Sequence, residues 1–253
     1  MDIHLLFKKQ GKRPAMKRII MMVLRNLFFV PYLWTKLCYY AKHTDNISDD
    51  KKNEFLKWIV HRANTGGNVI IESSGAEYIP EKESFMLFPN HQGMYDVLAL
   101  VQTCPRFFSV VMKQELKDIP FIKQVIAIMK GYVIDRDDVR QSMKVIQQVS
   151  KEVSEGKNFM IFPEGTRSRN GNQIGEFKGG SFKSATKAKC PIIPVAIIDS
   201  YKAFDTHSIQ NVIVQVHYLE PMYYEEYKNM KTTEIAEEVS NRIRNMIEKC
   251  EKV

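Results

Sequence analysis

The stretch FMLFPNHQGMYD, residues 85–96, predicts how the core of the chain is built. It opens with four apolar residues, Pro89 stops that run, and the turn-forming NHQG sequence precedes a second apolar run that begins near Val97. We therefore expect a buried strand, a polar turn and the start of a helix. Five helical steps separate two side chains by roughly 140°. His91 must then lie in the turn, from where Asp96 in the first helical turn can reach it.

The spacing of His91 and Asp96 suits a general base. A carboxylate bonded to one imidazole nitrogen fixes the tautomer and leaves the other nitrogen able to take a proton. Taken alone, a His-x4-Asp pattern is more typical of a loop histidine that caps or packs.

A second stretch, NFMIFPEGTRSR at residues 158–169, repeats the design of apolar strand, proline stop and polar turn. A third, GYVIDR at residues 131–136, ends on an arginine. Strands of one α/β sheet that end in polar turns predict a shared cleft. Arg136 and Arg167 would form an anion clamp there, because guanidinium groups bind phosphate in a bidentate manner. A base beside such a clamp predicts a phosphorylated acceptor.

Four segments, NHQGMYD, GYVIDR, FPEGTRSR and IIPVAI (192–197), resemble the four motif blocks of the glycerolipid acyltransferases in order and rough spacing. The similarity runs from about residue 68 to about residue 200, and Gly93 stands where the family usually has serine. The resemblance implies transfer of a fatty acyl group from an acyl thioester, either acyl-CoA or acyl-carrier protein. The implied acceptor is the sn-2 hydroxyl of 1-acyl-glycerol 3-phosphate (lysophosphatidic acid), and the implied product is phosphatidic acid.

The resemblance also implies roles for single residues. His91 would be the base and Asp96 the group that orients it. The acceptor site would contain Arg136, Glu164, Gly165, Thr166 and Arg167, with Lys113 and Lys178 as weaker candidates. The arginines would hold phosphate with the help of the Gly165–Thr166 turn, and Glu164 would orient an arginine or accept a glycerol hydroxyl. Lysines in loops are more often only solvated, and no metal or redox cofactor is implied.

The basic charge is concentrated at the start of the chain. The net charge is +8, and residues 1–44 hold nine of the 37 basic residues against one acid, Asp2. The remaining residues are balanced at 28 basic and 28 acidic. This distribution disfavours a nucleic-acid partner and favours contact of residues 1–44 with an anionic membrane surface. The four cysteines are widely spaced, which predicts neither a disulfide framework nor a metal site and fits a reducing compartment.

Residues 19–40 are strongly apolar but are interrupted by Arg25, Asn26, Pro31 and Lys36. The longest apolar piece is too short to cross about 30 Å of hydrocarbon, which takes roughly 20 residues. A straight helix would align Arg18, Arg25 and Lys36 in a cationic stripe, whereas a kink at Pro31 would give two short helices dipping into one leaflet. We expect a monotopic or peripheral protein at the cytoplasmic face of the cell membrane. A cleaved signal peptide and a helix packed on the domain are the alternatives.

The expected organisation is a membrane-interface helical segment (1–44), a linker with a short helix (45–67) and an α/β domain (68–253). Alternating strand and helix patterns predict a largely parallel, mixed sheet flanked by helices. The expected strands cover residues 69–71, 85–88, 107–112, 132–134, 159–162, 192–198 and 211–218, the last at an edge. Within the same family, another lysophospholipid or glycerol 3-phosphate could be the acceptor. A non-catalytic membrane-binding scaffold of the same fold is the alternative from a different class.

Overall fold

A seven-stranded mixed sheet forms the centre of the molecule. The computed structural model describes residues 16–135 and 138–252. The strands are β1 (Val69–Ser74), β2 (Met86–Pro89), β3 (Ser109–Lys113), β4 (Tyr132–Ile134), β5 (Phe159–Met160), β6 (Ile192–Ile198) and β7 (Val212–Tyr218), in the spatial order β1-β7-β6-β2-β5-β3-β4. All neighbouring strands run parallel except β6 and β7, which are antiparallel. This confirms the expected α/β fold with a largely parallel, mixed sheet.

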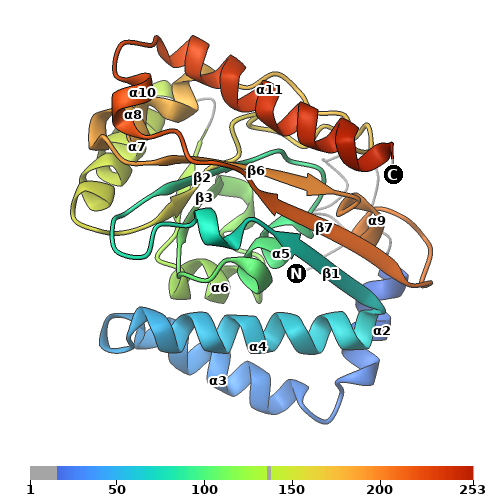
Figure 1. Ribbon diagram of the computed structural model, residues 1–253. Coiled ribbons are helices and arrows are strands. Elements are labelled where there is room, and N and C mark those ends of the chain that lie inside the picture. The colour runs from blue at the N-terminus through green and yellow to red at the C-terminus, as the bar shows by residue number, and fades with distance from the viewer. Residues whose placement is uncertain (1–15, 136–137, 253) are drawn as a thin grey trace.

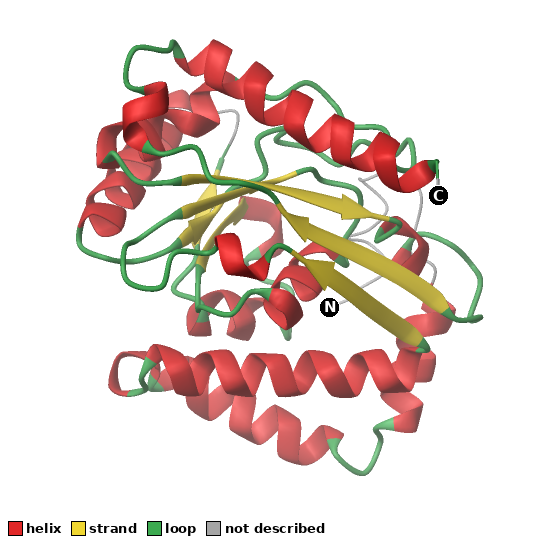
Figure 2. Ribbon diagram, viewed as in Figure 1, coloured by secondary structure: helices red, strands yellow, loops and turns green. Residues whose placement is uncertain are grey.

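Helices cover both faces of the sheet (Figures 1 and 2). On one face α11 (Thr232–Glu251) packs on β6, beside α7 (Val139–Ser154) and α8 (Lys183–Ala188). On the other face lie α5 (Asp96–Thr103) and α6 (Ile122–Ile128), with α4 (Asp49–Gly67) and α3 (Val30–Lys42) beyond them. The described residues also form α2 (Met16–Arg25), α9 (Tyr201–Phe204), α10 (Tyr224–Tyr227) and the 3-10 turns at 44–46, 76–78, 114–116 and 179–182.

The central strand β2 shows why this arrangement is stable. Successive side chains of a strand point to opposite faces. Met86 and Phe88 therefore pack in the cluster beneath α11, while Leu87 packs in the cluster beneath α4 and α5. All three side chains are fully buried. Burial on both faces explains the continuous apolar run that opens the 85–96 stretch.

The position expected for the last strand is wrong. β7 lies between β1 and β6 and is not an edge strand. Its alternating pattern arises because one face of the sheet is open there: Ile213 is 47% exposed, whereas its neighbour Val214 is fully buried. An alternating apolar and polar pattern indicates that one face of the sheet is uncovered. It does not distinguish an edge strand from a strand that is paired on both sides.

The segment expected to be a linker with a short helix is also different. Residues 49–67 form the 19-residue helix α4, which packs on β1 and α5. Its buried residues Phe55, Leu56, Ile59 and Val60 follow helical spacing and belong to the core. The helix ends at Gly67, and Asn68 adopts the left-handed conformation that commonly follows a helix. The short helix expected within this segment is therefore present, but it extends over nearly all of residues 45–67.

The N-terminal apolar segment forms two helices, α2 and α3, which meet at an angle of 100°. Asn26 stabilises the corner, because its amide donates to the carbonyls of Met22 and Arg62. Among the described residues, no single helix has the length and apolar character needed to cross a bilayer; the bent pair reaches them only when its two helices are taken together. Large apolar side chains are exposed around this corner, including Ile20, Val23, Leu24, Leu27, Phe28, Phe29 and Tyr32.

The cationic stripe expected on a straight helix is absent from the described part of this segment. Arg18 is fully buried, and its guanidinium donates to the carbonyls of Gly67, Asn68, Ser208 and Gln210. Arg25 bonds the carbonyl of Gly66 and the side chain of Asn68, and Lys36 lies 4.9 Å from the centre of the Phe55 ring. Arg18 and Arg25 therefore bind the carboxyl end of α4, where backbone carbonyls attract cations.

Candidate active site

Two polar turns meet at one edge of the sheet. β2 and β5 are parallel neighbours, so the turns that follow them emerge side by side. Two hydrogen bonds join these turns at His91: its backbone N–H donates to Glu164 Oε1 at 2.7 Å, and its carbonyl accepts from the N–H of Ser168 at 2.9 Å. The 85–96 and 158–169 stretches thus form one site, as the sequence predicts.

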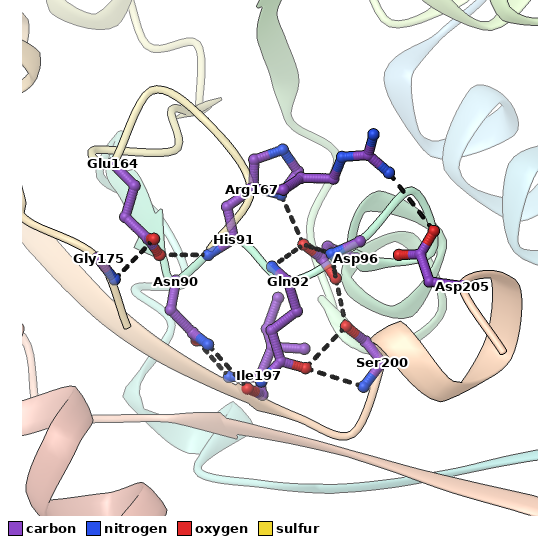
Figure 3. Close-up of polar contacts among 11 residues, drawn as sticks. Asn90, His91, Gln92, Asp96, Glu164, Arg167, Gly175, Ile197, Ser200 and Asp205 are labelled. Carbon is purple, nitrogen blue, oxygen red and sulfur yellow. Dashed lines mark hydrogen bonds and ion pairs between the residues drawn. The ribbon is translucent and has the colours of Figure 1, made fainter. Parts of the chain in front are cut away.

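The imidazole of His91 is hydrogen-bonded to the carboxylate of Asp96 (Figure 3). His91 Nδ1 lies 2.7 Å from Asp96 Oδ2, and the Asp96 side chain is completely buried. The same carboxylate accepts hydrogen bonds from the backbone N–H groups of Gln92 and Gly93 and from the hydroxyl of Ser200. The Asp96 oxygen can accept a proton from Nδ1 of the imidazole, and this pairing selects the tautomer that carries its proton on Nδ1. The lone pair of His91 then resides on Nε2.

The ring of His91 is also held by a stacking contact. Its centroid lies 3.9 Å from that of Phe162, with 16° between the two planes. The side chain keeps 19% of its surface exposed, so the site is open to a reactant on one side. An oriented, partly exposed imidazole paired with a buried carboxylate has the geometry that general-base catalysis would require.

Two buried amide side chains, which were not among the predicted site residues, complete the turn. Asn90 exchanges two hydrogen bonds with the backbone of Ile197, at 2.9 Å and 2.7 Å. Gln92 Oε1 accepts from the N–H and hydroxyl of Ser200, and its Nε2 donates to Asn172. These contacts tie the His91 turn to the end of β6. The signal available in the sequence was the presence of uncharged amides on both sides of a histidine that follows a buried strand.

Glu164 has a different environment from the one expected. It is 3% exposed, and its two carboxylate oxygens accept from the backbone N–H groups of His91 and Gly175, the latter at 2.8 Å. Burial raises the pKa of Glu164, and the two backbone hydrogen bonds partly oppose that shift. This geometry favours a role in fixing the His91 turn over the expected contact with an arginine or a glycerol hydroxyl.

Arg167 lies beside the His91–Asp96 pair, called the dyad below (Figure 3). Its Nη1 is 3.5 Å from Asp205 Oδ1, and the side chain is 16% exposed. Gly165 has the positive φ of 69° that its turn requires, and Thr166 is exposed. Arg136, the other half of the predicted anion clamp, lies outside the described residues.

The two lysine candidates are less well connected to the dyad. Lys113 ends β3 and forms an ion pair with Glu115. Lys178 is exposed, and its backbone N–H donates to the carbonyl of Pro163. Contacts of this kind are as typical of solvated loop lysines as of lysines that bind a substrate.

Within residues 16–135 and 138–252, no group of three or more His, Cys, Asp and Glu side chains is arranged to hold a metal ion.

The sequence model of the acyltransferase family matches residues 70–198, about half of the chain, and this range contains all four motif segments. The chain belongs to the acyltransferase family. Within this family it is 32% identical to the 1-acyl-sn-glycerol-3-phosphate acyltransferase of Borreliella burgdorferi over 64% of this chain and 66% of that one. It is 31% identical to the enzyme of the same name from Salmonella typhimurium, over 58% and 60% of the two chains.

The acyltransferase fold is supported independently by a solved structure. The crystal structure of the 1-acyl-sn-glycerophosphate acyltransferase of Thermotoga maritima superposes with a TM-score of 0.71 at 21% identity. The match covers 92% of this chain and 97% of the other. The chain spans between about half and about two thirds of the length of the curated relatives that it matches.

Proposed function

We propose that this chain transfers a fatty acyl group from an acyl thioester to the sn-2 hydroxyl of 1-acyl-glycerol 3-phosphate, forming phosphatidic acid for phospholipid synthesis. The observation that carries the proposal is the 2.7 Å contact between His91 Nδ1 and the buried Asp96 carboxylate, in a chain of the acyltransferase family. The names of the curated relatives support the choice of acceptor.

In the proposed reaction the acceptor hydroxyl attacks the thioester carbonyl while His91 Nε2 takes the hydroxyl proton. Asp96 stabilises the imidazolium that forms and stays ionised. The tetrahedral intermediate then collapses with cleavage of the carbon–sulfur bond, and the thiolate leaves with the proton from His91. The thioester is already an activated donor, so the mechanism needs no serine or cysteine nucleophile. Acyl-CoA and acyl-carrier protein both fit this chemistry.

The phosphate of the acceptor would bind to Arg167, with Arg136 as its proposed partner. A guanidinium offers paired N–H donors that match phosphate oxygens. The exposed Thr166 hydroxyl and the Gly165 turn lie next to Arg167 in the chain and are proposed to add donors. Glu164 acts in this scheme by holding the backbone of His91.

We further propose that the α2–α3 corner inserts into one leaflet at the cytoplasmic face of the membrane. Phe28 is 96% exposed and Leu24 is 63% exposed, and both lie at or beside the bend. Isolated exposed apolar residues are ordinary, but a contiguous group of this size marks an interaction surface. The apolar corner would carry most of the contact, because Arg18 and Arg25 are engaged by the carboxyl end of α4.

The decisive experiment is an acyl-transfer assay with a labelled acyl thioester. Lysophosphatidic acid, lysophosphatidylcholine and glycerol 3-phosphate serve as rival acceptors for the wild type and for His91→Ala. We expect labelled phosphatidic acid from the wild type and a loss of about 10²-fold or more in the variant. Transfer to a rival acceptor alone would contradict the proposed substrate. The absence of transfer to any acceptor, with vesicle binding retained, would favour a scaffold.

A further inference from the structure

The carboxylate of Asp205 lies between the two turns of the site, on a residue that no motif contains. Asp205 follows α9, and its backbone N–H donates to the carbonyl of Tyr201 at 2.8 Å. Oδ1 faces Arg167 at 3.5 Å (Figure 3). Oδ2 would lie 2.8 Å from a Cβ atom placed on Gly93. The space beside the His91 turn that a side chain at position 93 would need is therefore occupied by Asp205.

The contact between Asp205 and Arg167 is a loose one. Hydrogen bonds between a guanidinium and a carboxylate usually measure about 2.7–2.9 Å, so 3.5 Å indicates an ion pair without tight alignment. The Asp205 side chain is 28% exposed, in contrast to the completely buried Asp96. Burial raises the pKa of Asp205, and the nearby Arg167 offsets only part of that shift. Several hydrogen-bond donors fix Asp96, whereas the looser contact of Asp205 with Arg167 allows another anion to replace the Asp205 carboxylate there.

We propose that Asp205 is the resident counter-ion of Arg167 and that the phosphate of the acceptor replaces it there. This inference rests on the proposed function, because it concerns the same phosphate site. Acceptor and product of the reaction carry the same phosphate group, and an arginine without a competitor would hold both equally well. An internal carboxylate weakens both interactions by a similar amount. Asp205 thereby raises the KM for the acceptor and speeds release of the product.

The first test measures binding, so that it does not depend on turnover. Inorganic phosphate and glycerol 3-phosphate are titrated into the full chain at fixed ionic strength, in the wild type and in Asp205→Asn. We expect the Kd for both ligands to fall about 2- to 5-fold in the variant, the range expected for loss of a partly exposed ion pair. Glu238→Gln is the matched control, because Glu238 pairs with Arg242 on the remote helix α11. Its Kd should equal that of the wild type.

Two further variants test whether the change in Kd arises from the contact between Asp205 and Arg167. In an Arg167→Ala background, Asp205→Asn should leave the Kd unchanged, since the pair no longer exists. Gly93→Ala places a methyl group against Asp205 Oδ2 and should also lower the Kd, without changing the charge of the chain. A higher Kd in Asp205→Asn would overturn the proposal and make Asp205 a positioning residue for Arg167. An equal gain in the Arg167→Ala background would overturn it as well, by showing a general charge effect.

A measurement of acyl transfer tests the counter-ion role of Asp205 separately from the proposed acyltransferase function. With lysophosphatidic acid as acceptor, Asp205→Asn should lower the KM by the same 2- to 5-fold factor. Wild-type transfer to lysophosphatidic acid with an unchanged Kd and KM in Asp205→Asn would overturn the counter-ion role alone. Absence of transfer by the wild type would contradict the proposed function, while the phosphate titrations would still decide whether Asp205 competes for Arg167.

Discussion

Glu164 accepts a hydrogen bond from the backbone N–H of His91 at 2.7 Å, so the carboxylate of one motif holds the main chain of another. Its second oxygen holds Gly175 in the same way. The buried charge is stabilised by these two donors, yet burial still raises the pKa of Glu164. The position of the histidine therefore depends on a carboxylate that is costly to bury in its ionised form.

Glu164→Gln should remove a pH-dependent component of stability. The unfolded chain binds the Glu164 proton with the ordinary pKa near 4.5, and the folded chain binds it more tightly. The stabilising contribution is complete below pH 4.5 and is lost as the pH rises through the raised pKa of the folded state. The free energy of unfolding of the wild type minus that of Glu164→Gln should therefore fall as the pH rises above 4.5. Denaturant titrations at several pH values would measure it, and a constant difference would contradict the assignment.

Asp96→Asn should lower kcat by about 10²-fold with little change in the KM of the acceptor. The amide keeps the size of the side chain and an oxygen for the N–H groups of Gln92 and Gly93, but it lacks the charge that stabilises the imidazolium. The variant should remain folded. Asp50→Asn, at an exposed position on α4, is the matched control. A kcat equal to that of the wild type would show that Asp96 only shapes the turn.

Arg18→Ala should destabilise the fold by roughly 3 kcal/mol, because it leaves several buried or partly buried carbonyls without their donor. Lys17→Ala, at the exposed neighbouring position, should change the free energy of unfolding by less than about 0.5 kcal/mol. Urea titrations of both variants give the comparison. Equal stability of the two variants would mean that α2 contributes little to the folded domain.

Leu24→Asp combined with Phe28→Asp should reduce binding to phospholipid vesicles at least about tenfold, since both apolar side chains would lose their burial in lipid. Met143→Asp, at an exposed apolar position on α7, is the matched control. Vesicle sedimentation measures the effect. Point substitutions are preferable to removal of residues 1–44, which would also delete Arg18 and the core residue Leu37. Undiminished binding of the double variant would contradict leaflet insertion by this corner.

The fold was largely predictable because its strands are short apolar runs that end at prolines or polar turns. Patterns of this kind located β2, β5 and β6 and indicated a parallel core. The helix α4 was expected to be short because its outer face is highly charged, and β7 was placed at an edge because alternation reflects face exposure. Strand neighbours depend on long-range pairing, which local periodicity does not encode.

The dyad of the site was predictable from spacing, whereas its supporting contacts were not. His91 and Asp96 are near one another in the chain, and simple helix geometry relates them. Asn90 and Asp205 act through contacts with residues more than 30 positions away. The contacts of the Arg18 side chain could not be predicted either, because its partners include the distant Gln210.

The contacts of Arg18 also constrain the order of events during translation. The carbonyl of Gln210 is made 192 residues after Arg18, which corresponds to roughly 10–40 s of synthesis. Until then α2 cannot complete its docking, and the apolar corner that it forms with α3 leaves the ribosome well before helices α6 and α9, on which α3 and α2 pack. The nascent chain thus exposes an apolar surface before the domain has closed, so the proposed insertion of this corner into a bilayer does not depend on prior folding of the domain.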